Sequence, residues 1–367
     1  DRVRHYNPPV MKPIILNSYS AILIVNFAST TEARCEASPE YKGWKAGVAR
    51  IIITPKQAMW MAGYAARDHQ AEGKLHDLWA KALALEDAEG KQAVLISTDL
   101  LGFPKGLSDQ IRDRLESKYA LPRARIILHG THSHSGPVLK DALYDIYPID
   151  QQQIIDIEHY SAWLADQIVA LAGEALGAVE PVHIHAENGV TRFAVNRRNN
   201  DASTLKEVTE LKGPSDHAVP VIKVCDTQGN LMAVAFGYAC HPTVLDGYHW
   251  SGDYPGFAQI ELEKTYPGTT ALFFSGAGAD QNPLPRLTVG LAKQYGKELA
   301  AAVECVLEAD MRELSPELSA SYSEIDLPLN PPLTKEELLE IIRDSSAHAS
   351  YQQTWAVRML DKLERQE

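Results

Sequence analysis

Histidines form two groups in this chain, each at the end of an apolar run that is typical of a buried strand. The first segment, ILHGTHSHSGP, contains His129, His132 and His134, and the second, YACHPTVLDGYHWSGD, contains His241 and His249. Loops at the ends of strands are where a rigid scaffold presents functional groups. Because neutral imidazole is a common zinc ligand, these side chains are candidates for a metal centre.

His132 and His134 are two residues apart, a spacing that would place their side chains on opposite faces of a straight strand. The Ser-Gly-Pro sequence that follows favours a tight loop, in which both side chains can converge. We expect one histidine to bind metal and the other to act beside it, as a supporting group or a proton donor. The alternative is a pair of exposed loop histidines without a shared role.

His241 and Asp253 belong to the second segment, and each has a structural alternative. His241 follows the predicted strand MAVAFGYAC, and on its own it fits a buried, hydrogen-bonded histidine better than a metal ligand. Asp253, in SGDYPG, could cap a helix that starts at Pro255. It could instead orient a ligand histidine through a carboxylate–imidazole hydrogen bond.

Two further segments contain residues suited to substrate binding. Gly276 and Gly278, in SGAGADQNP, do not form a nucleotide-binding pattern, and we expect them to let the backbone approach a substrate closely. Arg197 and Arg198, in VNRRNND, could hold a carboxylate or an oxyanion through paired hydrogen bonds. The alternative for the two arginines is a solvated turn.

The elements around these residues indicate a mixed architecture. Helical spacing predicts helices at 105–119, 154–179, 255–266 and 287–307. Apolar runs bounded by turn residues predict strands at 44–55, 78–87, 91–98, 124–130, 220–225, 231–238 and 271–274, and a hairpin at 183–195. Hairpins beside strand–helix units favour an α/β fold with α+β layering, in which mixed β-sheets are flanked by helices.

Composition and charge limit the range of partners. The chain has 48 acidic and 35 basic side chains and a net charge of -13, without a basic stripe interleaved with aromatic residues, so we expect no nucleic-acid partner. None of its four cysteines lies in a C-x-x-C pair, which disfavours a cysteine zinc site. We expect Cys225, Cys240 and Cys305 to be buried thiols, with one disulfide as the alternative.

Three regions are expected along the chain. Residues 1–42 form a leader, in which one lysine after Met11 and a patchy apolar stretch at 14–27 favour a secretory signal and hence a secreted or periplasmic protein. That stretch is too short and too polar to span a bilayer, and no other segment is apolar for long enough. Residues 43–325 form the core, and 326–367 form a Pro-rich linker followed by helices, with Thr334 as a helix cap.

A series of short motifs resembles the neutral/alkaline non-lysosomal ceramidase family. The motifs run in one collinear order from about Gly47 to Pro283, and GTHSHSGP is the most specific of them. In order they are GVARIIITP, MAGY, GKLHDLWAKA, STDL, GTHSHSGP, NR, CHPT and SGDYPGFA.

The resemblance implies a zinc-dependent amidohydrolase that cleaves N-acyl sphingolipids such as ceramide. It implies that His132 and His241 bind Zn²⁺, that His134 lies beside the metal, and that Arg197 lies at the substrate. In such a site zinc activates a water molecule or polarises the amide carbonyl, while His134 or Arg197 stabilises the developing charge. The expected partner is a small amide or lipid, reached at a membrane surface.

The sequence departs from this family in several places. The family completes its zinc shell with a Glu and a Tyr beyond the Pro-rich linker, a region that this sequence does not contain, so we expect a C-terminally truncated chain. The family's N-R-S segment reads N-R-R here, and PLPRLTVGL lacks the serine that ceramidases have near the site. Two alternatives therefore stay open: a zinc hydrolase of another amide or ester, and a non-catalytic binding protein that has lost its metal.

Overall fold

The computed structural model describes residues 41–201 and 210–365. The expected leader, apart from its last two residues, lies outside this range, so a secretory signal stays a prediction. Within the described residues, no helix is both long enough and apolar enough to cross a membrane.

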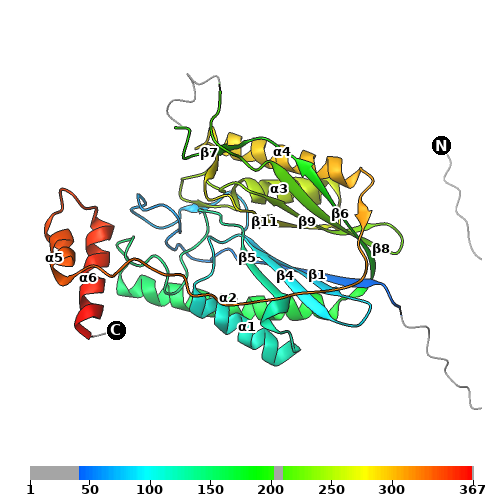
Figure 1. The fold of residues 1–367 in the computed structure, drawn as a ribbon, viewed down its shortest axis with the longest axis horizontal. Helices are drawn as coiled ribbons and strands as arrows, with labels where there is room; N and C mark the ends of the chain where they lie inside the picture. Colours follow the sequence, from blue (N-terminus) through cyan, green and yellow to red (C-terminus); the bar gives the residue numbers. More distant parts are fainter. Residues whose placement is uncertain (1–40, 202–209, 366–367) are drawn as a thin grey trace, which may run out of the picture. The chain divides into compact units, whose positions relative to one another are not determined.

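The centre of the fold is a nine-stranded mixed sheet with the order β11-β9-β8-β6-β1-β3-β4-β5, in which β13 pairs with β6 (Figure 1). We call β1, β3, β4 and β5 the first half of the sheet, and β6, β8, β9 and β11 the second half. The strands are β1 Trp44–Ile52, β3 Trp79–Glu86, β4 Gln92–Thr98, β5 Ile126–Gly130, β6 Glu180–Val190, β8 Ala218–Asp226, β9 Leu231–Tyr238, β11 Thr270–Ser275 and β13 Arg312–Glu313.

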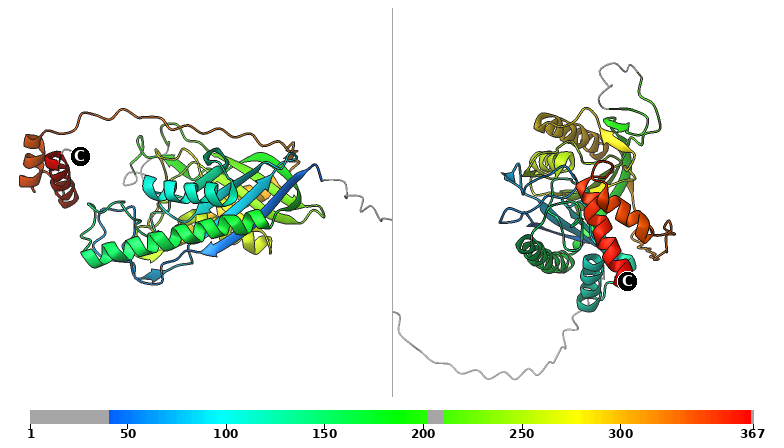
Figure 2. Two further views of the ribbon diagram at one scale, coloured as in Figure 1. Left: turned by 90° about the horizontal axis from the view of Figure 1, so that it is seen from below. Right: turned by 90° about the vertical axis from the view of Figure 1, so that its left-hand side faces the viewer.

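Two pairs of helices cover the two halves on their outer faces. Helices α1 (Lys105–Tyr119) and α2 (Gln151–Gly177) pack on the first half, and α2 runs along β1 and β3 (Figure 2). Helices α3 (Asp253–Thr265) and α4 (Val289–Leu307) pack on the second half (Figure 1). The predicted fold class, mixed β-structure flanked by helices, is confirmed.

The sheet bends so that β11 also packs against the first half. A small apolar core, which includes Leu83, Ile184 and Leu272, fills the space between the halves. Two buried polar groups join them: the Lys81 ammonium donates to the carbonyl of Ala271, and the Ser97 hydroxyl donates to that of Phe273. These bonds fix β11 above the strands that lead to the first histidine segment.

Parallel pairing explains why the two histidine segments meet. Strand β5 pairs with β4 in parallel, and β11 pairs with β9 in parallel, with α1 and α3 in the respective connections. Parallel neighbours end at the same edge of a sheet, and loops at that edge form the usual ligand site of such folds. The loops after β5, β9 and β11 therefore lie together.

Most predicted elements are found within a few residues, but the hairpin at 183–195 is wrong. Strand β6 has β1 and β13 on one side and β8 on the other, so both of its edges are occupied. The chain therefore leaves β6, and β7 (Ala194–Asn196) pairs with β12 (Gln281–Pro283) in a separate small sheet. A local pattern could not reveal this, because occupied edges depend on distant strands.

Smaller elements complete the described chain. The thiols of Cys225 and Cys240 are buried as predicted, whereas Cys305 is exposed, because α4 turns that residue away from the core. Thr334 caps α5 with Glu337 in a capping box, as predicted. The remaining elements are β2 Gly73–Lys74, β10 His249–Trp250, the 3₁₀ turn Arg123–Arg125, α5 Lys335–Arg343 and α6 Ser350–Arg365.

Candidate metal centre

Three imidazoles from two loops converge at the edge of the sheet. His132 and His134 follow β5, and His241 follows β9. Their ring centroids are 5.1 Å apart for His132 and His134, 4.8 Å for His132 and His241, and 5.6 Å for His134 and His241. One ligand nitrogen of each ring lies within 4.8 Å of the other two, so the three side chains could hold a metal ion.

The convergence of His132 and His134 depends on an unusual backbone conformation. His132 has φ of 68°, in the left-handed region that non-glycine residues seldom adopt. The turn places both imidazoles on one side of the loop, although a straight strand would separate them. Strained residues of this kind concentrate at functional sites, where the surrounding structure holds them.

Each ring is also oriented by a backbone carbonyl, which accepts a hydrogen bond from Nδ1. The three carbonyls are that of Leu101 for His132 at 2.8 Å, Gly63 for His134 at 3.1 Å, and Gly278 for His241 at 3.0 Å. A proton on Nδ1 leaves Nε2 as the free ligand atom, and such outer partners are typical of metal-binding histidines. The Nε2 atom of His134 is buried and has no hydrogen-bond partner among the described residues.

Burial favours the neutral imidazole of His134 and of His241. The pKa of His134 is lowered to about 3, mainly by burial and further by His132 and His241. The pKa of His241 is lowered by burial first, and also by His132 and by Arg197. Neutral imidazole is the form that binds metal, and nitrogen donors suit zinc, so the residues present fit a zinc ion.

His129 lies beside the three histidines but does not join them. Its Nε2 accepts a hydrogen bond from the backbone N–H of Ser275 at 3.1 Å, and burial lowers its pKa to about 4. It forms one wall of a pocket of about 280 Å³ that His132, His241 and the loop 275–279 also line. This pocket gives a small molecule access to the candidate metal ligands.

Comparisons with known proteins indicate the family of this chain. The family model described as neutral/alkaline non-lysosomal ceramidase, N-terminal, matches residues 44–322. The chain belongs to this ceramidase family. Among curated relatives, neutral ceramidase of Drosophila melanogaster is 24% identical over 61% of this chain, and neutral ceramidase B of Dictyostelium discoideum is 26% identical over 70%.

Solved structures confirm the ceramidase fold. A ceramidase complexed with C2 matches at a TM-score of 0.63 and 21% identity, and neutral ceramidase from Pseudomonas aeruginosa at 0.63 and 20%; each match covers 76% of this chain. The chain covers 32% and 37% of the two curated relatives and 46% of the two solved chains. It thus spans less than half the length of the ceramidases that it matches.

Two glycines, Gly63 and Gly278, allow the histidine loops to pack closely. A Cβ on Gly63, which has φ of 109°, would lie 2.5 Å from the His134 ring. A Cβ on Gly278 would lie 2.5 Å from the backbone nitrogen of Cys240. Gly276 and Gly278, predicted to approach a substrate, pack against the strand end at 239–240 and also line the pocket. In the sequence, the M-A-G-Y motif is the signal that indicates Gly63.

We expect Gly278→Ala to weaken the centre, because the added methyl group must displace a loop whose carbonyl orients His241. The displacement should destabilise the protein by about 1–3 kcal/mol and lower zinc affinity by about 10- to 100-fold. Urea unfolding and competition with a chromophoric chelator measure the two effects. Gly247→Ala is the control, since a Cβ there has no neighbour within 4 Å; equal losses in both variants would contradict the role of Gly278.

Asp253 does not orient a histidine and does not act as an N-cap. It is the first residue of α3, and its buried carboxylate accepts hydrogen bonds from the backbone N–H groups of Val244, Leu245 and Tyr254 at 3.3, 2.9 and 2.7 Å. Both expectations for Asp253 are thus corrected, because the chain folds the loop after His241 back over the start of α3. The carboxylate holds that loop, and therefore acts on His241 only through the backbone.

Arg197 and Arg198 directly follow β7, on the side of His241. The backbone N–H of Arg197 donates to the carbonyl of Asp280 at 2.7 Å, and His241 is tied to the same β12 segment through Gln281 at 2.9 Å. Nε of Arg197 is buried and has no hydrogen-bond partner among the described residues. The predicted substrate arginine therefore lies on a segment shared with a candidate ligand.

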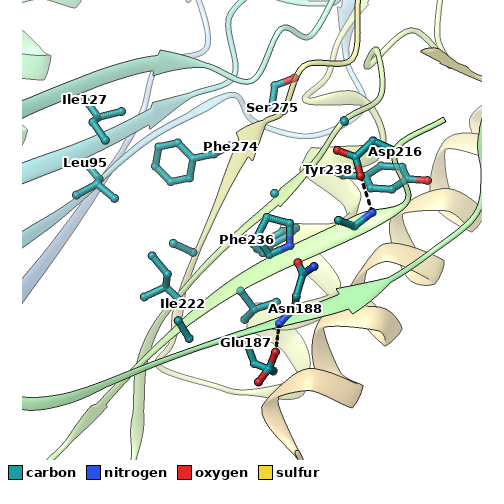
Figure 3. A pocket seen from close by; sticks show the side chains of 18 of the residues that line it. Leu95, Ile127, Glu187, Asn188, Asp216, Ile222, Phe236, Tyr238, Phe274 and Ser275 are labelled. Atoms are coloured by element: carbon teal, nitrogen blue, oxygen red, sulfur yellow. Dashed lines mark hydrogen bonds between the residues drawn. The ribbon is translucent and has the colours of Figure 1, made fainter. Parts of the chain in front are cut away.

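An apolar groove adjoins the pocket of the centre. It has a volume of about 880 Å³ and shares Ser275 and Gly276 with the histidine pocket. Figure 3 shows side chains from both halves of the sheet in its walls, with Ile127 on one half and Ile222 and Phe274 on the other. The apolar walls of this groove are suited to a hydrocarbon chain.

Proposed function

We propose that this chain carries the metal-binding part of a zinc-dependent hydrolase that cleaves the amide of N-acyl lipids of the ceramide type. The observation that carries the proposal is the convergence of three imidazoles, each oriented by a backbone carbonyl through Nδ1. Membership of the ceramidase family and the adjoining apolar groove support the choice of reaction and substrate.

In this proposal His132 and His241 hold the zinc ion. The buried Nε2 of His134 carries no proton while Nδ1 donates to Gly63, so His134 is either the third ligand or a general base beside the metal, rather than a proton donor. When bound, zinc supplies a Lewis acid that polarises a carbonyl and lowers the pKa of water. Arg197 offers a guanidinium to the oxyanion that forms at the amide carbon. The 280 Å³ pocket leaves room for the amide group beside the metal ligands.

The acyl chain of the substrate would lie in the apolar groove. The groove begins at Ser275 and Gly276, next to the histidines, so an amide at the centre leaves its chain at the groove entrance. Burial of each methylene contributes about 0.8 kcal/mol. Chains of increasing length should therefore bind progressively more tightly until the groove is filled.

Hydrolysis of N-acyl sphingosines that carry two to sixteen acyl carbons tests this function. We expect release of sphingosine by the zinc-loaded protein, no release after chelation, and recovery when zinc is restored. Turnover that persists without metal, or that is confined to esters, would contradict the proposal.

Replacing Ile127 tests the groove. Ile127 is 49% exposed on β5, so Ile127→Asp should fold, yet it places a charge in the groove wall. We expect KM for a sixteen-carbon acyl chain to rise about 10-fold, because the chain loses an apolar contact worth about as much as the burial of one large apolar side chain. KM for a two-carbon chain should change little. The matched control is Ile52→Asp, at a 43% exposed isoleucine outside the groove. If both variants raise KM alike, the groove does not hold the chain.

Export is a second part of the proposal, based on the predicted leader. The check is expression of the gene in a secreting host, followed by N-terminal sequencing of the protein in the medium. A leader that remains attached inside the cell would contradict it.

A further inference from the structure

Three arginines line a second pocket on the Arg197 side of the candidate metal centre. It has a volume of about 520 Å³, and its lining is strongly polar. The lining residues are Arg197, Arg198, Asn199, Asn200, Asp201, Asn282, Leu284 and Arg286. Because a water molecule occupies about 30 Å³, the pocket has room for a polar group of many atoms.

The pocket is built on the segments that hold His241. The backbone N–H of Arg198 donates to the Asn196 side chain at 3.0 Å, at the end of β7. Arg286 follows β12, and its guanidinium donates to the carbonyl of Thr243 at 3.3 Å, two residues after His241. The arginines thus come from two sides of one small sheet, and an anion between them would lie close to the reacting bond.

The three guanidinium groups repel one another. Across residues 41–201 and 210–365, none of them forms an ion pair with a carboxylate. The pKa of Arg197 is lowered by burial and then by Arg198 and Arg286, while Asp280 acts in the opposite direction. Asp201 in the lining reduces the formal charge of the pocket from +3 to +2, in a chain whose net charge is -13.

An anion would relieve this repulsion. Guanidinium groups bind carboxylate and phosphate through paired hydrogen bonds, which are about twice as strong as neutral ones. The side-chain amides of Asn199 and Asn282 in the lining can supply further donors to the same group, whereas the amide of Asn200 donates to the carbonyls of Asn196 and Lys212. Neutral ceramide offers hydroxyl groups at this place, which would leave the positive charges unpaired.

We propose that this pocket binds an anionic group of the substrate, a carboxylate or a phosphate, so that the preferred substrate is an acylated amine that carries a negative charge next to its amide. The inference rests on the proposed amide hydrolysis and replaces neutral ceramide with an anionic N-acyl amine as the preferred substrate. It assigns substrate recognition to Arg198 and Arg286, two residues outside the matched motif positions.

Three amides with the same dodecanoyl chain test the proposal. N-dodecanoylglycine carries a carboxylate, N-dodecanoylphosphoethanolamine carries a phosphate, and N-dodecanoylethanolamine is neutral. We expect kcat/KM of the zinc-loaded protein to be about 10- to 100-fold higher for at least one anionic amide, as for hydrogen bonds to a charged group. The preferred member of the anionic pair identifies carboxylate or phosphate as the ligand. Equal kcat/KM for all three would overturn the inference while leaving the hydrolase proposal intact.

The variants Arg198→Gln and Arg286→Gln should each reduce the preference for the anionic amide about 10-fold. Arg192→Gln, at an exposed arginine outside the pocket, should leave the preference unchanged. A preference that survives in the double variant would overturn the assignment of these residues.

Binding to the metal-stripped protein separates this inference from the proposed function. Calorimetric titration should show tighter binding of the preferred anionic amide than of the neutral amide, and the double variant Arg198→Gln/Arg286→Gln should lose the difference. Equal binding of the two amides by the unsubstituted protein would overturn the inference. Arginine-dependent anion binding without turnover of any amide by the zinc-loaded protein would support the pocket and contradict the hydrolase.

Discussion

Replacing His241 by alanine is expected to abolish stoichiometric zinc binding. The unsubstituted protein should bind about one zinc per chain, because three neutral imidazoles lie within reach of one ion. Alanine at position 241 leaves two nitrogen ligands on a single loop. Loss of a group that hydrogen-bonds to a metal ligand lowers metal affinity roughly 10- to 100-fold, and we expect loss of the ligand itself to lower zinc affinity further. Elemental analysis and competition with a chelator measure content and affinity.

The same measurement on His132→Ala and His134→Ala distinguishes the roles of the two loop histidines. We expect His132→Ala to lose zinc as His241→Ala does. If His134 is the third ligand, its alanine variant also loses zinc; if it is a general base, the variant keeps zinc but loses turnover. His249→Ala, at an exposed histidine outside the cluster, is the control. Full zinc content in all three cluster variants would remove the basis of the proposed function.

Replacing Asp253 by alanine should destabilise the protein by at least about 3 kcal/mol, because it leaves three buried backbone N–H groups without an acceptor. The left-handed φ of 55° at this position adds a further cost for alanine. Urea unfolding measures the loss, and Asp246→Ala in the same loop, where the side chain is exposed, is the control. Similar stability of the two variants would show that the carboxylate does not hold the loop.

Comparison with the Asp253→Asn variant tests how the contribution of Asp253 to the free energy of unfolding depends on pH. Burial raises the pKa of Asp253 from 3.8 to about 6, although three N–H groups favour its ionised form. The folded state therefore binds a proton more tightly than the unfolded state, and the contribution of Asp253 to stability falls as pH rises from about 4 to 6. The free-energy difference between the unsubstituted protein and Asp253→Asn should narrow over this window, by up to about 3 kcal/mol. A difference that widens would show that the carboxyl group ionises more readily in the folded protein.

The parts of the site that lie close together in the sequence could be predicted from it. The sequence predicts that His132, His134 and His241 lie at strand ends, because each follows an apolar run. Such a run is a local pattern that indicates a buried strand. The motif order indicated the ceramidase family, and most elements have the predicted bounds within a few residues. The error at 183–195 arose where strand pairing, rather than strand propensity, decided the path of the chain.

Only the tertiary structure decided how these residues act together. The carbonyls that orient His132, His134 and His241 are 31, 71 and 37 residues away in the chain, and the partners of Asp253 are likewise set by packing. The apolar groove depends on the bend that brings the two halves of the sheet together. Arg286 meets Arg197 because β7 pairs with β12. The left-handed turn at His132 is likewise held by the surrounding structure. The sequence by itself determined which chemical groups are present and at which strand ends, because those follow from local patterns; their convergence required the fold, because long-range packing has no local signal.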